Sequence, residues 1–143
     1  MKPIDNILLI DDNEVVNNLH VMSIEEMEFC RNIHIATNGQ KGIDFLNQAG
    51  EFASLPSEHV DPELIIVDVK MPVLDGFGFM EEYQKLPAER KAKHKVIMVT
   101  SSLLIKDEEK AKSYTDLAAF EMKPLLVPVL KRLCSTLLES NNG

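Results

Sequence analysis

The residues of this sequence best suited to chemistry are acids, hydroxyls and one lysine, each placed directly after a short apolar run. They are Asp11, Asp12, Asp68, Thr100, Ser101, Ser102 and Lys123. If the apolar runs are neighbouring parallel strands, these side chains meet in the crevice outside the carboxyl ends of the strands. Three carboxylates in one crevice repel one another unless a cation neutralises them, and their oxygens suit Mg²⁺. The pattern therefore predicts a divalent-metal site.

A metal site flanked by a hydroxyl and an ammonium group suits phosphoryl transfer, because the transition state spreads negative charge over oxygens that need electrostatic stabilisation. Asp68 ends the most apolar run, Leu64 to Val67, and is placed as the nucleophile. Taken singly, these residues have ordinary explanations: Asp11 and Asp12 are typical of a helix N-cap, and Lys123 of a helix start. Their combination at matching strand ends favours the chemical interpretation.

Five short apolar runs alternate with stretches of helical periodicity, which is the pattern of a parallel sheet covered by helices. The predicted strands are 6–10, 33–37, 64–67, 95–99 and 118–122. The first predicted helix follows Asn13, and its apolar positions include Val15, Val16, Leu19, Met22 and Met27. The second buries Ile43, Phe45 and Leu46, the third ends near Pro87, and the last two span 106–114 and 125–138.

Composition sets the protein class. A chain of 143 residues that is 45% hydrophobic and 27% charged is expected to form one soluble domain, residues 1–143, with no output domain. It has no apolar run long enough to span a membrane and no secretory signal. A net charge of −8 argues against nucleic-acid binding. Cys30 and Cys134 lack metal-ligand spacing and are expected to be free thiols, which favours a cytoplasmic location.

Four fragments, in this order and spacing, resemble the receiver domain of two-component response regulators, in its stand-alone, chemotaxis-regulator-like form. They are Leu8–Asp12, Ile66–Pro72 with Asp75-Gly76, Val99–Ser101 and Phe120–Pro124. The resemblance spans about 6–138 and implies a flavodoxin-like, doubly wound (βα)5 fold with strand order 2-1-3-4-5. It also implies a phosphoryl donor, either a sensor histidine kinase or a histidine phosphotransfer protein, and a downstream protein target of unknown identity. The protein would be a monomer or a phosphorylation-linked homodimer.

The resemblance assigns roles to the acids that match the family motif. Asp68 resembles the phosphoacceptor, which also contacts the metal. Asp12 resembles a direct ligand of Mg²⁺ or Mn²⁺, and Asp11 a ligand that acts directly or through water. The backbone carbonyl of Lys70 resembles a further ligand. No other cofactor is implied, and the sequence has no nucleotide-binding fingerprint.

The resemblance also implies a switch. Thr100 is similar to the hydroxyl that moves toward the phosphoryl group, and Lys123 to the ion-pair partner of that group. Phe120 is similar to the aromatic residue that changes rotamer with Thr100, although ordinary core packing explains Phe120 equally well. A cis peptide bond between Lys123 and Pro124 is common in the family, and we expect one here.

Two other functions stay open on sequence grounds. An adaptor of the same fold that works without phosphorylation would be indicated by degenerate acidic positions, whereas the acidic set is intact here. A phosphatase of the haloacid-dehalogenase type would carry a second aspartate two residues after the nucleophile, where Lys70 stands. Lys70 and Ser102 occupy positions that influence water access in receivers, without predicting the lifetime of a phosphorylated state. The segment 48–62 is long for such a domain and is expected to be a surface loop or a partner contact.

Overall fold

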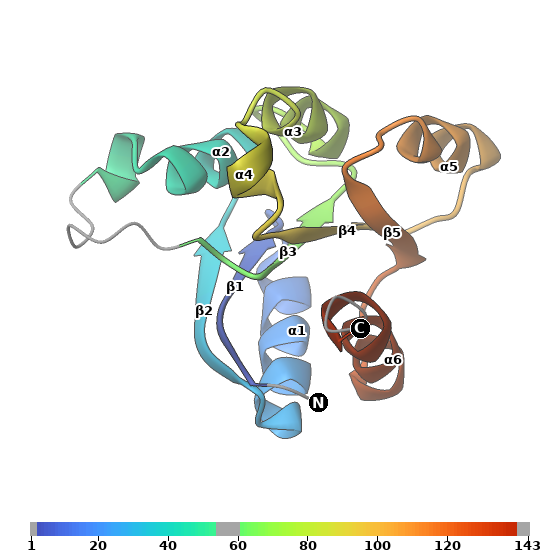
Figure 1. The fold of residues 1–143 in the computed structure, drawn as a ribbon. Helices are drawn as coiled ribbons and strands as arrows, with labels where there is room; N and C mark the ends of the chain where they lie inside the picture. The colour runs from blue at the N-terminus through green and yellow to red at the C-terminus, as the bar shows by residue number, and fades with distance from the viewer. Residues whose placement is uncertain (1–2, 54–60, 140–143) are drawn as a thin grey trace.

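The computed structural model describes residues 3–53 and 61–139, which form one parallel sheet covered by helices on both faces (Figure 1). The strands are β1 (Ile4–Ile10), β2 (Cys30–Ala36), β3 (Leu64–Asp68), β4 (Lys95–Thr100) and β5 (Leu117–Met122). Their order is β2-β1-β3-β4-β5, and every neighbouring pair is parallel. The predicted flavodoxin-like topology is therefore confirmed.

The helices divide between the two faces of the sheet. They are α1 (Glu14–Met27), α2 (Gly39–Asn47), α3 (Gly76–Tyr83), α4 (Ala88–Lys91), α5 (Ile105–Lys112) and α6 (Val127–Glu139), with a short 3-10 turn at Gly50–Phe52. Helices α1 and α6 cover one face, and the other four lie on the opposite face (Figure 1). Each face has its own hydrophobic cluster. All five residues of β3 are buried, as expected for a central strand covered on both sides.

Side chains of the loops begin three of these helices. Asn13, Asn38 and Asp75 each accept a hydrogen bond from a backbone N–H in the first turn of α1, α2 and α3, over 3.1, 2.8 and 2.8 Å. Such N-caps satisfy amide groups that have no partner inside the helix. Asn13, rather than Asp11 or Asp12, caps α1, so both acids remain available for other contacts.

Helix α1 forms where it was predicted, but the apolar positions of the prediction do not mark its buried face. Val15, Leu19 and Met22 are 67%, 36% and 66% exposed, whereas the buried residues are Asn17, His20, Ser23 and Ile24. The polar side chains are tolerated inside because Asn17 and His20 form hydrogen bonds to the neighbouring loops. Hydrophobic periodicity cannot reveal a face that is buried through hydrogen bonds.

Several other element boundaries differ from the prediction, most clearly at β2 and after α3. Strand β2 begins at Cys30 rather than Ile33, because it pairs with the whole of β1, from Ile4 opposite Cys30 onward. The one-turn helix α4 follows Pro87, where the sequence predicted only the end of a helix. A single turn is too short to show helical periodicity, which explains why the sequence did not reveal it.

The long connection between α2 and β3 is described in part. Its first residues form the 3-10 turn, where Phe52 packs edge-on against Phe45 of α2 with ring centroids 5.2 Å apart. Residues 54–60 of the predicted surface loop lie outside the described residues. Cys134 is buried and Cys30 is partly buried. In the described part of the chain, none of the helices could cross a membrane.

Candidate functional site

The parallel sheet brings the predicted site residues to one edge. Asp11 follows β1, Asp68 ends β3, Thr100 ends β4 and Lys123 follows β5. Because β1, β3, β4 and β5 are consecutive neighbours in the sheet, these residues form a row along its carboxyl edge. The backbone N–H of Lys123 donates to the carbonyl of Thr100 over 2.8 Å, which carries the pairing of β4 and β5 one residue beyond the strands.

Three carboxylates converge at this edge. Asp11, Asp12 and Asp68 each contribute an oxygen atom, and these oxygens lie within 4.8 Å of one another. Asp11 and Asp68 are each only 3% exposed, whereas Asp12 is exposed. A set of carboxylate oxygens that is buried on one side and open to water on the other suits Mg²⁺, which prefers oxygen ligands and keeps part of its hydration shell. The residues present therefore fit a divalent cation.

Lys123 bridges the two buried acids. Its Nζ lies 3.1 Å from Oδ2 of Asp68 and 3.2 Å from Oδ2 of Asp11. Burial alone would lower the pKa of Lys123, but its hydrogen bond to Asp68 and the charges of both carboxylates outweigh burial, so its pKa lies above the usual value. The side chain is thus a fixed ammonium group directly beside Asp68.

The charged form of the Asp68 carboxylate is disfavoured by its surroundings. Burial raises the pKa of Asp68 above its usual value, and the negative charge of Asp11 raises it further. Lys123 and the backbone N–H of Lys70 act in the opposite direction without reversing the shift. The excess negative charge at this site therefore favours an added cation. The side chain of Lys70 itself is exposed.

The two predicted switch residues, Thr100 and Phe120, contact the loop after β4 and the hydrophobic core, respectively. The Thr100 hydroxyl is buried and donates to the carbonyl of Ser102 over 2.8 Å, while the backbone N–H of Ser102 donates back to it over 3.2 Å. Phe120 is half-buried and packs against the core cluster beneath α5. The predicted cis peptide bond between Lys123 and Pro124 is confirmed.

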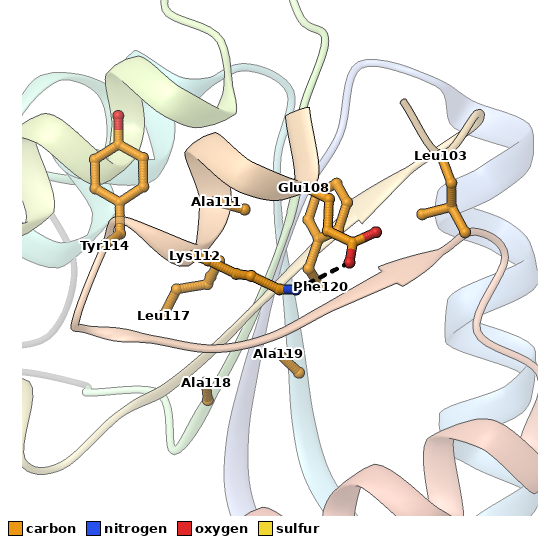
Figure 2. Close-up of a pocket in the computed structure, with 9 residues that line it drawn as sticks. All are labelled: Leu103, Glu108, Ala111, Lys112, Tyr114, Leu117, Ala118, Ala119 and Phe120. Atoms are coloured by element: carbon orange, nitrogen blue, oxygen red, sulfur yellow. Dashed lines mark ion pairs between the residues drawn. The ribbon is translucent and has the colours of Figure 1, made fainter. Parts of the chain in front are cut away.

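A cavity of about 400 Å³ lies between α5 and β5, beside Phe120 (Figure 2). Leu103, Ala111 and Leu117 contribute apolar walls. At its mouth, Lys112 and Glu108 of α5 form an ion pair of 3.2 Å. The cavity leaves space beside the Phe120 ring for a change of side-chain conformation.

The loop after Asp68 is held by the start of α2. Val73 and Leu74 have left-handed backbone angles, with φ of 49° and 78°, which are unfavourable for residues other than glycine. The N–H of Gly39 donates to the carbonyl of Leu74 over 3.0 Å, and the N–H of Gln40 donates to that of Val73 over 3.4 Å. A Cβ atom at Gly39 would lie 2.3 Å from the Leu74 carbonyl oxygen. Glycine is therefore required at this contact.

Sequence reasoning missed two residues that contact the site loops. Asn17 donates from Nδ2 to the backbone carbonyl of Asp11 over 2.9 Å, and His20 accepts from the backbone N–H of Leu125 over 3.0 Å. The signal that could have found them is the recurrence of polar residues at Asn17, His20 and Ser23, on the side of the helix opposite Val15, Leu19 and Met22.

Comparisons with known proteins agree with this geometry. A family model described as the response regulator receiver domain matches residues 7–125. The chain is 31% identical to the chemotaxis protein CheY of Halobacterium salinarum over 134 residues, which cover 92% of this chain and 95% of that protein. Among solved structures, a two component response regulator from Cytophaga hutchinsonii is 28% identical with a TM-score of 0.81, covering 96% of this chain and 99% of that one. The bacteriophytochrome response regulator AtBRR is 26% identical with a TM-score of 0.77, covering 92% and 91%.

Proposed function

Because this chain belongs to the response regulator receiver domain family of two-component signalling, we propose that it is a phosphorylation switch whose acceptor is Asp68. The observation that carries this proposal is the placement of the buried Asp68 carboxylate beside the Lys123 ammonium group, which also contacts the Asp11 carboxylate. An acid in such surroundings can serve as a nucleophile whose product charge is already balanced.

The donor in this proposal is the phosphohistidine of a sensor histidine kinase or of a histidine phosphotransfer protein. An Asp68 carboxylate oxygen attacks the phosphorus atom and forms an acyl phosphate, while the phosphorus–nitrogen bond of the donor breaks and the imidazole takes up the bond's electron pair. The charge on the transferred group stays constant, so the task of the protein is to stabilise the charge spread in the transition state. Lys123 is already 3.1 Å from Asp68 and does not need to move far to do so.

The acidic cluster is proposed to bind Mg²⁺ or Mn²⁺ through Asp11, Asp12 and Asp68, with the backbone carbonyl of Lys70 as a further ligand. When bound, the cation would neutralise negative charge on the phosphoryl oxygens. Exposed Asp12 lies on the open side of the cluster and would receive the cation from solvent, whereas buried Asp11 also retains Lys123. Nucleotide cofactors play no part in this proposal.

Phosphorylation is proposed to change the surface formed by α5, β5 and α6. Thr100 would exchange its bond with the Ser102 carbonyl for a phosphoryl oxygen, and Phe120 would turn into the neighbouring cavity (Figure 2). This shifts an equilibrium between two conformations, as in other phosphorylation switches. The altered surface then acts on a downstream protein. Slow attack of water on the acyl phosphate resets the switch, at positions that Lys70 and Ser102 flank.

The proposal is tested by intact mass after incubation with acetyl phosphate or phosphoramidate, with and without Mg²⁺. We expect one phosphoryl adduct that requires Mg²⁺ and is absent in Asp68→Asn. Lys123→Met should slow labelling by about 100-fold, because it removes the cation that faces the transferred group. Exposed Lys131→Met on α6 is the matched control and should label normally.

Failure to form the adduct would contradict the proposal. If a folded wild-type protein forms no adduct with either donor under a rapid acid quench, and none with a phosphohistidine protein, Asp68 is not an acceptor. The phosphorylation-independent adaptor would then be the correct function. Continuous release of phosphate from a phosphate ester would instead indicate a phosphatase.

A further inference from the structure

Helix α1 buries three polar side chains on a face where helices usually bury apolar ones. Asn17 and His20 are 4% and 2% exposed, one turn apart on the face toward the sheet and α6, while Val15 and Met22 face solvent. Burying polar groups carries a free-energy cost that hydrogen bonds offset only in part. The Oδ1 atom of Asn17 has no hydrogen-bond partner in the described part of the chain. These residues therefore do not serve stability alone.

The hydrogen bond from Asn17 reaches the loop that carries two of the three acids. Its Nδ2 donates to the backbone carbonyl of Asp11 over 2.9 Å, and this bond is buried. The Asp11 side chain also forms a hydrogen bond within this loop: its Oδ1 accepts from the backbone N–H of Asn13 over 2.8 Å. Asn17 thus fixes the backbone from which Asp11 and Asp12 extend.

The hydrogen bond from His20 reaches the opposite end of the chain. Its Nε2 accepts from the buried backbone N–H of Leu125 over 3.0 Å, across 105 positions of sequence. Pro124 has no N–H, so Leu125 offers the first backbone donor after Lys123. Burial, together with the nearby charge of Lys123, lowers the pKa of His20 to about 4, so at neutral pH the ring is uncharged and Nε2 remains an acceptor.

These contacts form a closed ring with the active site. Asp11 and Lys123 meet through the ion pair of 3.2 Å between Oδ2 and Nζ. The backbone beside each partner is hydrogen-bonded to α1, at Asn17 for Asp11 and at His20 for Lys123. Helix α1 is therefore hydrogen-bonded to the backbone on both sides of the ion pair between Asp11 and Lys123.

Resting on the proposed function, we infer that Asn17 and His20 are positioning residues for phosphoryl transfer: through α1 they hold Asp11 and Lys123 at the correct separation around Asp68. Both side chains are hydrogen-bonded to the backbone of other residues, so both act on Asp68 indirectly. His20 sets the position of the lysine and should affect the rate of transfer. Asn17 sets the position of the acids and should affect the affinity for Mg²⁺.

His20 is tested with two variants of similar volume. His20→Gln keeps an acceptor near the position of Nε2, whereas His20→Met fills the space without one. We expect His20→Met to lower the maximal rate of Asp68 labelling by phosphoramidate about tenfold, because a small displacement of a catalytic group costs rate steeply. His20→Gln should recover most of that rate. The half-saturating concentrations of donor and Mg²⁺ should stay unchanged in both.

Asn17 is tested by Asn17→Leu, which keeps the volume and removes the donor. We expect its apparent dissociation constant for Mg²⁺, measured by thermal shift on the unphosphorylated protein, to rise about tenfold, as it does when groups that orient metal ligands are removed. Ser23→Ala is the matched control. Ser23 is 6% exposed on the same face but has no hydrogen bond to either site loop in the described ranges.

A spectroscopic readout separates positioning from a general loss of stability. The amide proton of Leu125 should lose its hydrogen-bonded chemical shift in His20→Met and keep it in His20→Gln and Ser23→Ala. The inference is overturned if His20→Met labels at the wild-type rate, or if the Gln and Met variants lose rate equally. Wild-type labelling is measured first: if the wild type gains no adduct, the proposed function has failed, whereas a normal wild type with unaffected variants overturns only the positioning roles.

Discussion

At the scale of single residues, Lys123 occupies the carboxylates that a divalent cation would also bind. The ammonium group already lies beside Asp68 and Asp11, and it neutralises part of their charge. A cation that binds there would enter a site whose charge is already partly compensated, which should moderate its affinity and keep it exchangeable. In the proposed function the same lysine also stabilises the incoming phosphoryl group.

His20 should make the stability of the fold depend on pH in a defined window. Its pKa is lowered from 6.5 in the unfolded chain to about 4 in the folded protein, so the unfolded state binds the extra proton first as the pH falls. The free energy of unfolding should therefore decrease between about pH 6.5 and pH 4, by about 3 kcal/mol in total. Below pH 4 this contribution no longer changes.

Urea unfolding of the wild type and His20→Gln across this pH range checks the effect. The other titratable groups are the same in both proteins, so the difference between their free energies of unfolding isolates the contribution of His20. We expect the stability of the wild type relative to His20→Gln to fall as the pH decreases from 6.5 to 4. Parallel curves for the two proteins would show that His20 does not titrate in this way.

At the scale of elements, the contact between α2 and the loop after β3 depends on one glycine. Gly39→Ala would place a methyl group against the Leu74 backbone carbonyl, and the left-handed angles of that loop leave it little freedom to yield. We expect the free energy of unfolding to fall by about 2 kcal/mol or more, which urea denaturation can measure.

Gly78→Ala is the matched control for this contact. A Cβ at Gly78 would approach the same residue, but at Cδ1 of the Leu74 side chain, which can rotate away. Alanine also favours the helix that Gly78 occupies, so we expect a change within about 1 kcal/mol of the wild type. Equal stability of Gly39→Ala and the wild type would show that the loop moves freely.

The sequence predicted most elements and little of how they are joined. The five strands could be predicted because β3 is a continuous apolar run and the other strands alternate with helical stretches. Their order was implied by the resemblance to the receiver family. The grouping of Asp11, Asp68 and Lys123 followed from strand ends, and their chemical roles stay predictions. The buried face of α1 could not be found from hydrophobicity, since hydrogen bonds to distant loops decide it. The contact of Gly39 with Leu74 likewise depends on tertiary structure.

At the scale of the whole molecule, we expect the acidic cluster to link cation binding to folding. The chain carries a net charge of −8, and three carboxylates gather at one edge of its sheet. A cation that binds only the folded state stabilises it by mass action. We expect Mg²⁺ at 100 times its dissociation constant to raise the free energy of unfolding by about 2.7 kcal/mol.

Thermal melting with increasing Mg²⁺ measures this stabilisation. Asp12→Asn should lose most of it at the same concentration, because the exposed carboxylate of the cluster is removed. Sodium chloride at equal ionic strength controls for general screening of the net charge. Equal stabilisation by both salts would mean that the cluster does not bind Mg²⁺ specifically.

The ion pair between Asp11 and Lys123 also determines when the site comes into existence during protein synthesis. The two residues are separated by 112 positions, which a ribosome adding about 5–20 residues per second needs roughly 6–20 seconds to cover. Throughout that interval the nascent chain has Asp11 without Lys123. If Asp68 is the acceptor that we propose, a partly made chain would be a poor substrate for phosphoryl donors, and phosphorylation would be reserved for chains whose last strand has joined the sheet.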